Sequence, residues 1–206
     1  MIFFENLHRF KSKILKIRNL KISNKINFGS KKANFFFKKI LRNSKFYFEY
    51  GSGSSTLQAD IFKTRFVSIE LDKSYFTLIQ KKLKKKSIQY INLGPVGEFS
   101  YPLFKNKKRI LNYIKSVNSH FKINDYPDFI LIDGRFRVAC CINLFFLIKK
   151  IKAKTTILLD DYEKREHYKI LNKFFKIVKV GRMAILYPNY HNNKKNLLDK
   201  YIFDSR

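Results

Sequence analysis

The chain has 206 residues, of which 45% are hydrophobic and 17% aromatic, which is enough for one packed domain and excludes wholesale disorder. Its 44 Lys and Arg against 15 Asp and Glu give a formal net charge of +29. This excess favours contact with polyanions such as RNA, anionic lipid or acidic glycans, although drift toward a Lys-, Ile-, Asn- and Phe-rich composition explains it equally simply.

The N-terminal region is predicted to be a basic helical extension over residues 1–43. Residues 1–30 are rich in Lys, Arg and Asn with apolar side chains at loose helical spacing, and a second helix is expected over 31–43. The main domain should span 44–188, and residues 189–206 form a polar tail.

From residue 46 onward, the pattern alternates between strands and helices, which is typical of a parallel sheet covered by helices. The expected strands are 46–49, 65–70, 88–93, 128–132 and 155–159, and the expected helices are 54–62, 73–85, 108–120, 138–150 and 168–175. Residues 176–180 and 183–187 flank a Gly-Arg turn and should pair antiparallel. We therefore predict an α/β fold, a three-layer Rossmann-like sheet of about seven strands, mostly parallel with an antiparallel C-terminal hairpin, and with helices on both faces.

The cellular location is predicted from three features. The only cysteines, Cys140 and Cys141, are adjacent, which makes a poor disulfide or metal framework and favours a reducing compartment. The first residues lack a signal-peptide pattern, and the longest apolar run, near 144–148, is too short to span a bilayer. We expect a soluble cytoplasmic protein without a transmembrane segment; the sequence predicts no oligomeric state.

A glycine turn joins the first strand to the following helix. A strand that ends in Gly-x-Gly and opens a helix presents backbone amides and the positive end of the helix dipole to a ligand. Gly51 permits the tight turn, and Gly53 is expected to let the backbone approach the ligand closely. Gly-x-Gly alone is a weak signal, so its neighbours decide what is bound.

Acidic and hydroxyl side chains around the turn narrow the ligand. Glu49 lies two residues before Gly51, where a carboxylate suits a cationic amine and repels a phosphate. Glu70 ends the next strand, nineteen positions after Gly51, the spacing of an acid that accepts hydrogen bonds from a ribose diol. The third glycine of the dinucleotide fingerprint is missing, and Ser54, Ser55 and Thr56 occupy that region. A ligand with a ribose and an amine but no pyrophosphate suits S-adenosylmethionine better than NAD.

Further acids end the fourth and fifth strands, where ligands of open parallel sheets bind. Asp133 follows Ile130 to Ile132, and Asp160 and Asp161 follow Ile157 to Leu159. The order of these features over roughly residues 44–188 resembles the class I S-adenosylmethionine-dependent methyltransferases: Glu49-x-Gly51-x-Gly53, Glu70, Asp133, Asp160-Asp161 and a terminal hairpin. The serine in place of the third glycine departs from the commoner family pattern.

The resemblance implies roles for these residues. Glu49 would help to hold the methionine ammonium, Glu70 would bind the ribose hydroxyls, and Ser54 and Asp133 would also contact the cofactor. The acids at the ends of strands four and five look similar to those of catechol-type O-methyltransferases, which hold a divalent cation such as Mg²⁺ that lowers the pKa of the acceptor hydroxyl. Alternatively, Asp133 acts alone on cofactor or acceptor, and Asp160 or Asp161 caps the next helix.

Three basic side chains near these acids are candidates for binding the acceptor or for removing its proton. Arg135 and Arg137 either clamp a carboxylate, phosphate or sulfate of the acceptor or neutralise nearby acids. His167, together with Asp133, is a candidate catalytic residue as general base, or else an exposed histidine at a helix start.

The predicted function is methyl transfer to a small-molecule or glycan-like acceptor, most simply at oxygen. Two alternatives stay open: an RNA- or ribosome-directed methyltransferase recruited by its charge, and a non-catalytic module that binds nucleotide or polyanion on the same fold. The lysine run at 81–86 suits contact with nucleic acid, but a charge run on a helix is usually a solvated face.

Overall fold

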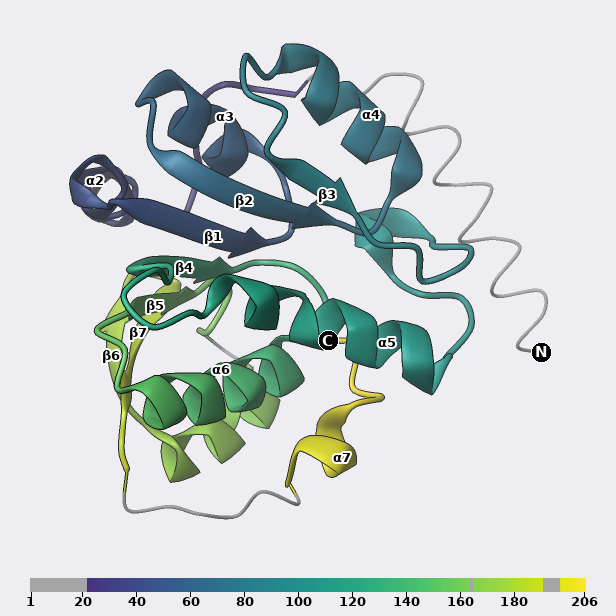
Figure 1. The fold of residues 1–206 in the computed structure, drawn as a ribbon, viewed down its shortest axis with the longest axis vertical. Coiled ribbons are helices and arrows are strands. Elements are labelled where there is room, and N and C mark those ends of the chain that lie inside the picture. Colours follow the sequence, from purple (N-terminus) through teal and green to yellow (C-terminus); the bar gives the residue numbers. More distant parts are fainter. Residues whose placement is uncertain (1–21, 164, 191–196) are drawn as a thin grey trace.

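A computed structural model describes residues 22–163, 165–190 and 197–206. Its centre is a seven-stranded sheet with the order β3-β2-β1-β4-β5-β7-β6 (Figure 1). The strands are β1 (Phe46–Tyr50), β2 (Arg65–Glu70), β3 (Ile88–Tyr90), β4 (Phe129–Ile132), β5 (Thr156–Leu159), β6 (Phe175–Val180) and β7 (Met183–Pro188). The first five strands pair in parallel, and β7 pairs antiparallel with both β5 and β6. The predicted fold class is confirmed.

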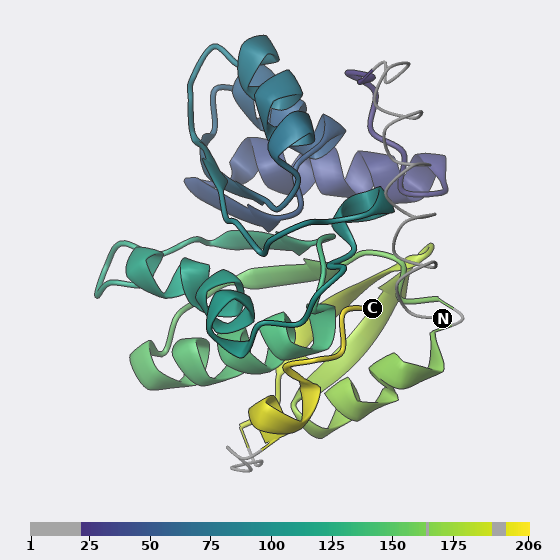
Figure 2. The same cartoon turned by 90° about the vertical axis from the view of Figure 1, so that its right-hand side faces the viewer.

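Helices cover both faces of the sheet, in three layers (Figures 1 and 2). The α-helices are α2 (Lys31–Asn43), α3 (Ser54–Ile61), α4 (Lys73–Lys82), α5 (Lys107–Ile114), α6 (Arg137–Ile151) and α7 (Leu197–Tyr201), and the 3-10 segments are η1 (Glu98–Ser100), η2 (Lys115–His120) and η3 (Glu166–Lys173). The first three helices lie on one face, whereas α5, α6, η3 and α7 lie on the other.

The central strands are apolar because both of their faces are buried. Successive side chains of a strand point to opposite faces, so Ile130 and Ile132 of β4 enter the core beneath α6, while Phe129 and Leu131 enter the core beneath α2 and α3. This two-sided burial fixes the register of β4 against β1 and β5, and with it the positions of the residues that follow each strand.

Helix α2 packs on the sheet. Ser30 caps its start by accepting a hydrogen bond from the backbone of Ala33, and the buried positions Ala33, Phe37 and Leu41 follow the helical repeat. The Phe37 ring contacts the rings of Tyr47 and Phe129 at centroid distances of 6.0 and 5.5 Å. Residues 31–43 therefore share the core of the main domain. The helical pattern predicted over residues 1–30 is wrong for residues 22–30, which form bends and irregular backbone, and residues 1–21 lie outside the described residues.

Three predicted helices differ in extent or type. Helix α4 ends at Lys82 because the Asp60 carboxylate accepts hydrogen bonds from the backbones of Lys84 and Lys85 and holds them in a turn. The predicted helix at 108–120 is divided into α5 and η2, and the one at 168–175 is the 3-10 segment η3. In the polar tail, α7 packs against α6 and buries Ile202.

Within the described residues, no helix is both long enough and apolar enough to cross a membrane.

Candidate active site

A cavity of about 490 Å³ lies beyond the carboxyl ends of β1, β2, β4 and β5. Parallel strands bring their carboxyl ends to one edge of the sheet, so residues distant in the chain meet there. The cavity is lined by Gly51, Ser52, Glu70, Leu71, Asp72, Tyr75, Gly97, Glu98, Phe99, Ser100, Tyr113, Asp133, Gly134, Arg135, Arg137, Asp160, Asp161 and Arg182. The lining includes six acidic residues and three arginines, so it is acidic within a strongly basic protein.

Position 51 can accommodate only glycine without strain. Its φ of +91° lies in the left-handed region, and a Cβ there would come within 2.9 Å of the backbone of Asp133 and Gly134. The turn after β1 therefore presses against the end of β4. Gly51 donates its backbone hydrogen bond to Ile69 on β2 and so ties three strand ends together.

Gly53 and Ser54 do not line the cavity. Gly53 is the N-cap of α3 with an extended φ of 174°, and a Cβ at this position would have the Tyr75 hydroxyl as its nearest neighbour at 3.7 Å, an ordinary contact. The backbone N–H of Gly53 donates to the Thr56 hydroxyl at 2.9 Å. Gly53 and Ser54 therefore shape the helix start next to the cavity.

The Glu70 carboxylate faces the cavity and is surrounded by donors. One oxygen accepts the backbone N–H groups of Leu71 and Asp72, each at 2.8 Å, and the Ser100 hydroxyl at 2.9 Å. The other accepts the backbone N–H and the hydroxyl of Ser52. Burial raises the pKa of Glu70, and these hydrogen bonds oppose the shift.

Glu49 is fully buried on the opposite face of the sheet from the α6 core and does not line the cavity. Its carboxylate accepts hydrogen bonds from the hydroxyls of Tyr47 (2.7 Å), Ser55 (2.6 Å) and Thr56. Burial raises the pKa of Glu49, and these hydroxyls lower it. The geometry therefore joins Glu49 to the start of α3, outside the residues that line the cavity.

Asp133 is the acid at the end of β4, and its side chain is 36% exposed toward the cavity. Arg137, on the first turn of α6, donates to its carboxylate at 2.9 Å. Burial raises the pKa of Asp133 to about 7; Asp160 and Asp161 add to the shift and Arg137 opposes it. Asp133 is thus expected to hold its proton more tightly than an exposed aspartate does.

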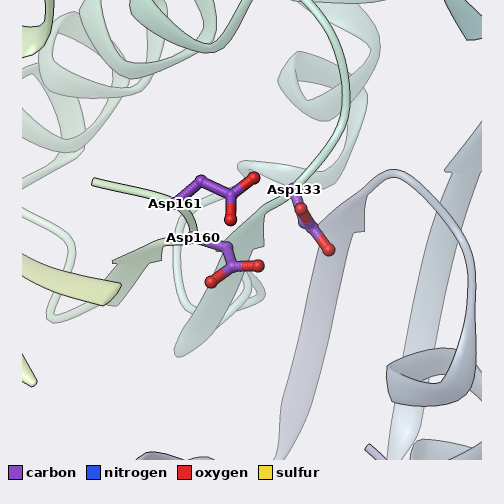
Figure 3. Close-up of side chains that lie close together, drawn as sticks. All are labelled: Asp133, Asp160 and Asp161. Atoms are coloured by element: carbon purple, nitrogen blue, oxygen red, sulfur yellow. The ribbon is translucent and has the colours of Figure 1, made fainter. Parts of the chain in front are cut away.

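Asp160 and Asp161, at the end of β5, face Asp133 (Figure 3). Arg182, in the turn between β6 and β7, holds both oxygens of Asp160 at 2.9 and 2.6 Å. Asp161 accepts from Arg165 at 2.8 Å and from Arg137 at 3.3 Å. Bidentate guanidinium–carboxylate pairing is strong and directional, so these contacts fix the far wall of the cavity.

The three aspartates are candidate ligands for a divalent cation. One oxygen of each lies within 4.8 Å of the others, a spacing that a cation can bridge. Each carboxylate, however, already faces a guanidinium group, and three arginines compensate the three negative charges. A cation would have to compete with these guanidinium groups for the carboxylate oxygens, so the ion pairs disfavour a resident metal ion. Magnesium binding stays a prediction that these ion pairs oppose.

His167 lies on η3 and does not line the cavity. Its ring packs against Tyr168 at a centroid distance of 4.2 Å, and its Nε2 is buried without a hydrogen-bond partner among the described residues. Burial and the charge of Arg206 lower the pKa of His167. The structure therefore brings Asp133, but not His167, to the cavity.

Arg137 and Arg135 differ although both line the cavity. Arg137 is 2% exposed and donates to Asp133, to Asp161 and to backbone oxygens. Arg135 is half-buried and forms no ion pair or side-chain hydrogen bond with the described residues. The neutralising role foreseen for the pair belongs to Arg137.

Several cavity residues were not foreseen from the sequence. Ser52 and Ser100 are short polar side chains without a distinctive pattern, and Arg182 reaches Asp160 only because of the orientation of the β6–β7 turn. The burial of Glu49 did have a signal, since Tyr47 lies two positions earlier and alternate residues of a strand share a face.

The comparisons with known proteins bear on the fold. No family model matches the sequence, and no curated protein matches it. A methyltransferase-like protein from Silicibacter pomeroyi superposes with a TM-score of 0.72 and 22% identity, covering 89% of this chain and 100% of that one. The fold is that of a class I methyltransferase. The O-methyltransferase from Bacillus cereus, in complex with SAH, gives a TM-score of 0.51 at 13% identity over 87% of this chain and 90% of that one.

Proposed function

We propose that this chain is an S-adenosylmethionine-dependent methyltransferase that acts on an oxygen of a small-molecule or glycan-like acceptor. The observation that carries the proposal is that one cavity is lined both by Glu70 at the end of β2 and by Asp133 at the end of β4, on either side of the Gly51 turn. The class I methyltransferase fold supports it, as does the complex of the similar Bacillus cereus O-methyltransferase with SAH.

The acidic lining suits this cofactor, which carries a sulfonium, an ammonium and one carboxylate and is therefore cationic overall. The ribose hydroxyls would donate to Glu70 in the positions that the Ser52 and Ser100 hydroxyls take here. Glu49 is proposed to set the start of α3, and through it the Gly51 turn, instead of holding the ammonium directly.

Asp133 is proposed to accept the proton of the acceptor hydroxyl. When bound, S-adenosylmethionine supplies a methyl group that is already activated by its sulfonium sulfur. The protein then needs to align the acceptor oxygen and remove its proton. Asp133 is open to the cavity, and the hydrogen bond from Arg137 orients its carboxylate. No step requires a metal ion.

Calorimetric titration with S-adenosylmethionine and with its product S-adenosylhomocysteine (SAH) tests the proposal. We expect saturable binding of both at one site per chain. Failure of both ligands to bind would reject every enzymatic interpretation of this cavity and leave only a non-catalytic use of the fold.

A further inference from the structure

Arg135 is a cation without a partner in the wall of the cavity. Its Nε atom is shielded from solvent and has no hydrogen-bond partner among the described residues. The other cavity arginines, Arg137 and Arg182, are engaged by Asp133, Asp160 and Asp161. Arg135 itself forms no ion pair with these or any other described carboxylates.

Two phenol groups near Arg135 are also unsatisfied. The Tyr113 hydroxyl is buried close to the backbone of Arg135, completes no hydrogen bond of good geometry among the described residues, and lies against Gly134, where a Cβ would overlap it. The Tyr168 hydroxyl is likewise buried and unpartnered, and Tyr168 interacts electrostatically with Arg135 and Arg137. Burial raises the pKa of Tyr113 well above its ordinary value, so this phenol remains a hydrogen-bond donor at neutral pH.

An unpaired guanidinium group in a partly dry wall is unfavourable until an anion reaches it. Burial and the neighbouring Arg137 lower the pKa of Arg135, but an arginine keeps its charge at neutral pH. A carboxylate or a phosphate offers the several acceptor oxygens that a guanidinium fork and an adjacent phenol can bind together.

We infer that Arg135, with Tyr113 beside it, forms a subsite for a carboxylate or phosphate group carried by the methyl acceptor. This inference rests on the proposed function, because it names the acceptor as an anionic small molecule. Arg135 follows β4, two strands away from the Glu70 site on β2 in the sheet order β2-β1-β4. A cofactor whose ribose lies at Glu70 and whose sulfur faces Asp133 leaves Arg135 on the side of the acceptor.

The test uses inorganic phosphate as the probe and two variants that each lose one positive charge. Phosphate is titrated into the SAH-loaded protein at constant ionic strength, with binding followed by calorimetry. Arg135→Gln removes the proposed contact, and Arg42→Gln removes an exposed arginine on α2 that lies outside the cavity. We expect saturable phosphate binding in wild type and Arg42→Gln, and at least tenfold weaker binding in Arg135→Gln.

Arg135→Gln should fold, because no described ion pair or side-chain hydrogen bond is lost. Arg135→Lys is a second variant that keeps the charge but not the fork, and we expect its phosphate affinity to fall between those of wild type and Arg135→Gln. Equal phosphate binding by wild type and Arg135→Gln, or no saturable binding by SAH-loaded wild type, would overturn the inference.

The anion at Arg135 could belong to the methyl acceptor or be the carboxylate of the cofactor, and the SAH affinity of Arg135→Gln distinguishes the two. An SAH affinity of Arg135→Gln within about twofold of wild type supports an acceptor group, whereas a tenfold loss without phosphate binding to loaded wild type would assign Arg135 to the cofactor carboxylate. If wild type binds no SAH, the proposed function fails by itself. Phosphate titration of the unliganded protein, compared between Arg135→Gln and Arg42→Gln, then still decides whether the anion subsite exists.

Discussion

At the scale of single residues, Glu70 is the side chain on which cofactor binding should depend most. Replacing it by alanine removes a buried acceptor that five donors surround in the unliganded protein. Hydrogen bonds to a charged group contribute about 1.5–3 kcal/mol, so Glu70→Ala should weaken SAH binding roughly 10- to 100-fold. Calorimetry on this variant, with the exposed Asp125→Ala as control, checks the prediction; undiminished binding in Glu70→Ala would show that the ribose lies elsewhere.

If Asp133 is the base, its raised pKa predicts how kcat/KM depends on pH. Burial raises the pKa of Asp133 to about 7, so below this pH the carboxyl group is protonated and cannot accept the acceptor's proton. Measured with an identified acceptor, kcat/KM for that acceptor should therefore rise with pH and level off above about 7. Asp133→Asn should lower kcat by roughly 100-fold or more and remove this acid limb. A wild-type profile without an acid limb near 7 would contradict the assignment of Asp133 as the base.

At the scale of elements, the turn between β1 and α3 offers a matched pair of glycines. Gly51→Ala places a Cβ in the left-handed region and against the backbone of Asp133, so we expect a loss of at least about 2 kcal/mol in unfolding free energy, and no SAH binding. Gly53→Ala adds a Cβ in ordinary contact with the Tyr75 hydroxyl and should change stability by less than about 1 kcal/mol. Chemical denaturation measures both, and equal effects would refute the geometry of the turn.

The ion pairs at the ends of β4 and β5 predict that magnesium binds weakly there or not at all. Because Arg137, Arg165 and Arg182 compensate the three aspartates, a divalent cation gains little by entering. Added magnesium should leave the melting temperature of the unliganded protein unchanged, and EDTA should not impair SAH binding. A saturable rise in melting temperature with magnesium, lost in Asp160→Asn, would restore the cation-dependent interpretation.

The sequence predicted the elements of the sheet well because buried parallel strands are unbroken apolar runs such as Phe129–Ile132. It predicted less about where the helices end. The end of α4 depends on Asp60, which lies more than twenty residues earlier in the chain and accepts from Lys84 and Lys85. Such contacts become visible only once the chain is folded.

The candidate site was predicted in part. The positions of Glu70 and Asp133 follow from strand order, because residues after parallel strands meet at one edge. The pairing of Asp160 with Arg182 and the missing partner of Arg135 do not follow from any local pattern, since both depend on how the β6–β7 turn and α6 are oriented. The folded structure is therefore needed to tell an arginine that pairs with an aspartate, Arg182, from one that does not, Arg135.

At the scale of the whole molecule, the surface and the cavity have opposite electrostatic character. The chain carries a formal charge of +29, with exposed lysines at 81, 82 and 84–86, whereas acids outnumber arginines in the cavity. RNA should therefore bind the surface with an affinity that falls about a thousandfold between 50 and 200 mM salt, without placing a nucleotide in the cavity. Incubation with total RNA and methyl-labelled S-adenosylmethionine should leave the RNA unlabelled. Labelled RNA would instead favour an RNA-directed enzyme.

The most direct test of the central claim is a crystal structure of the protein with SAH bound. We predict that SAH lies in the cavity with its ribose hydroxyls on Glu70 and its sulfur facing Asp133, while Glu49 keeps its hydrogen bonds to Ser55 and Thr56. SAH bound outside the cavity, or with its ribose away from Glu70, would contradict this account.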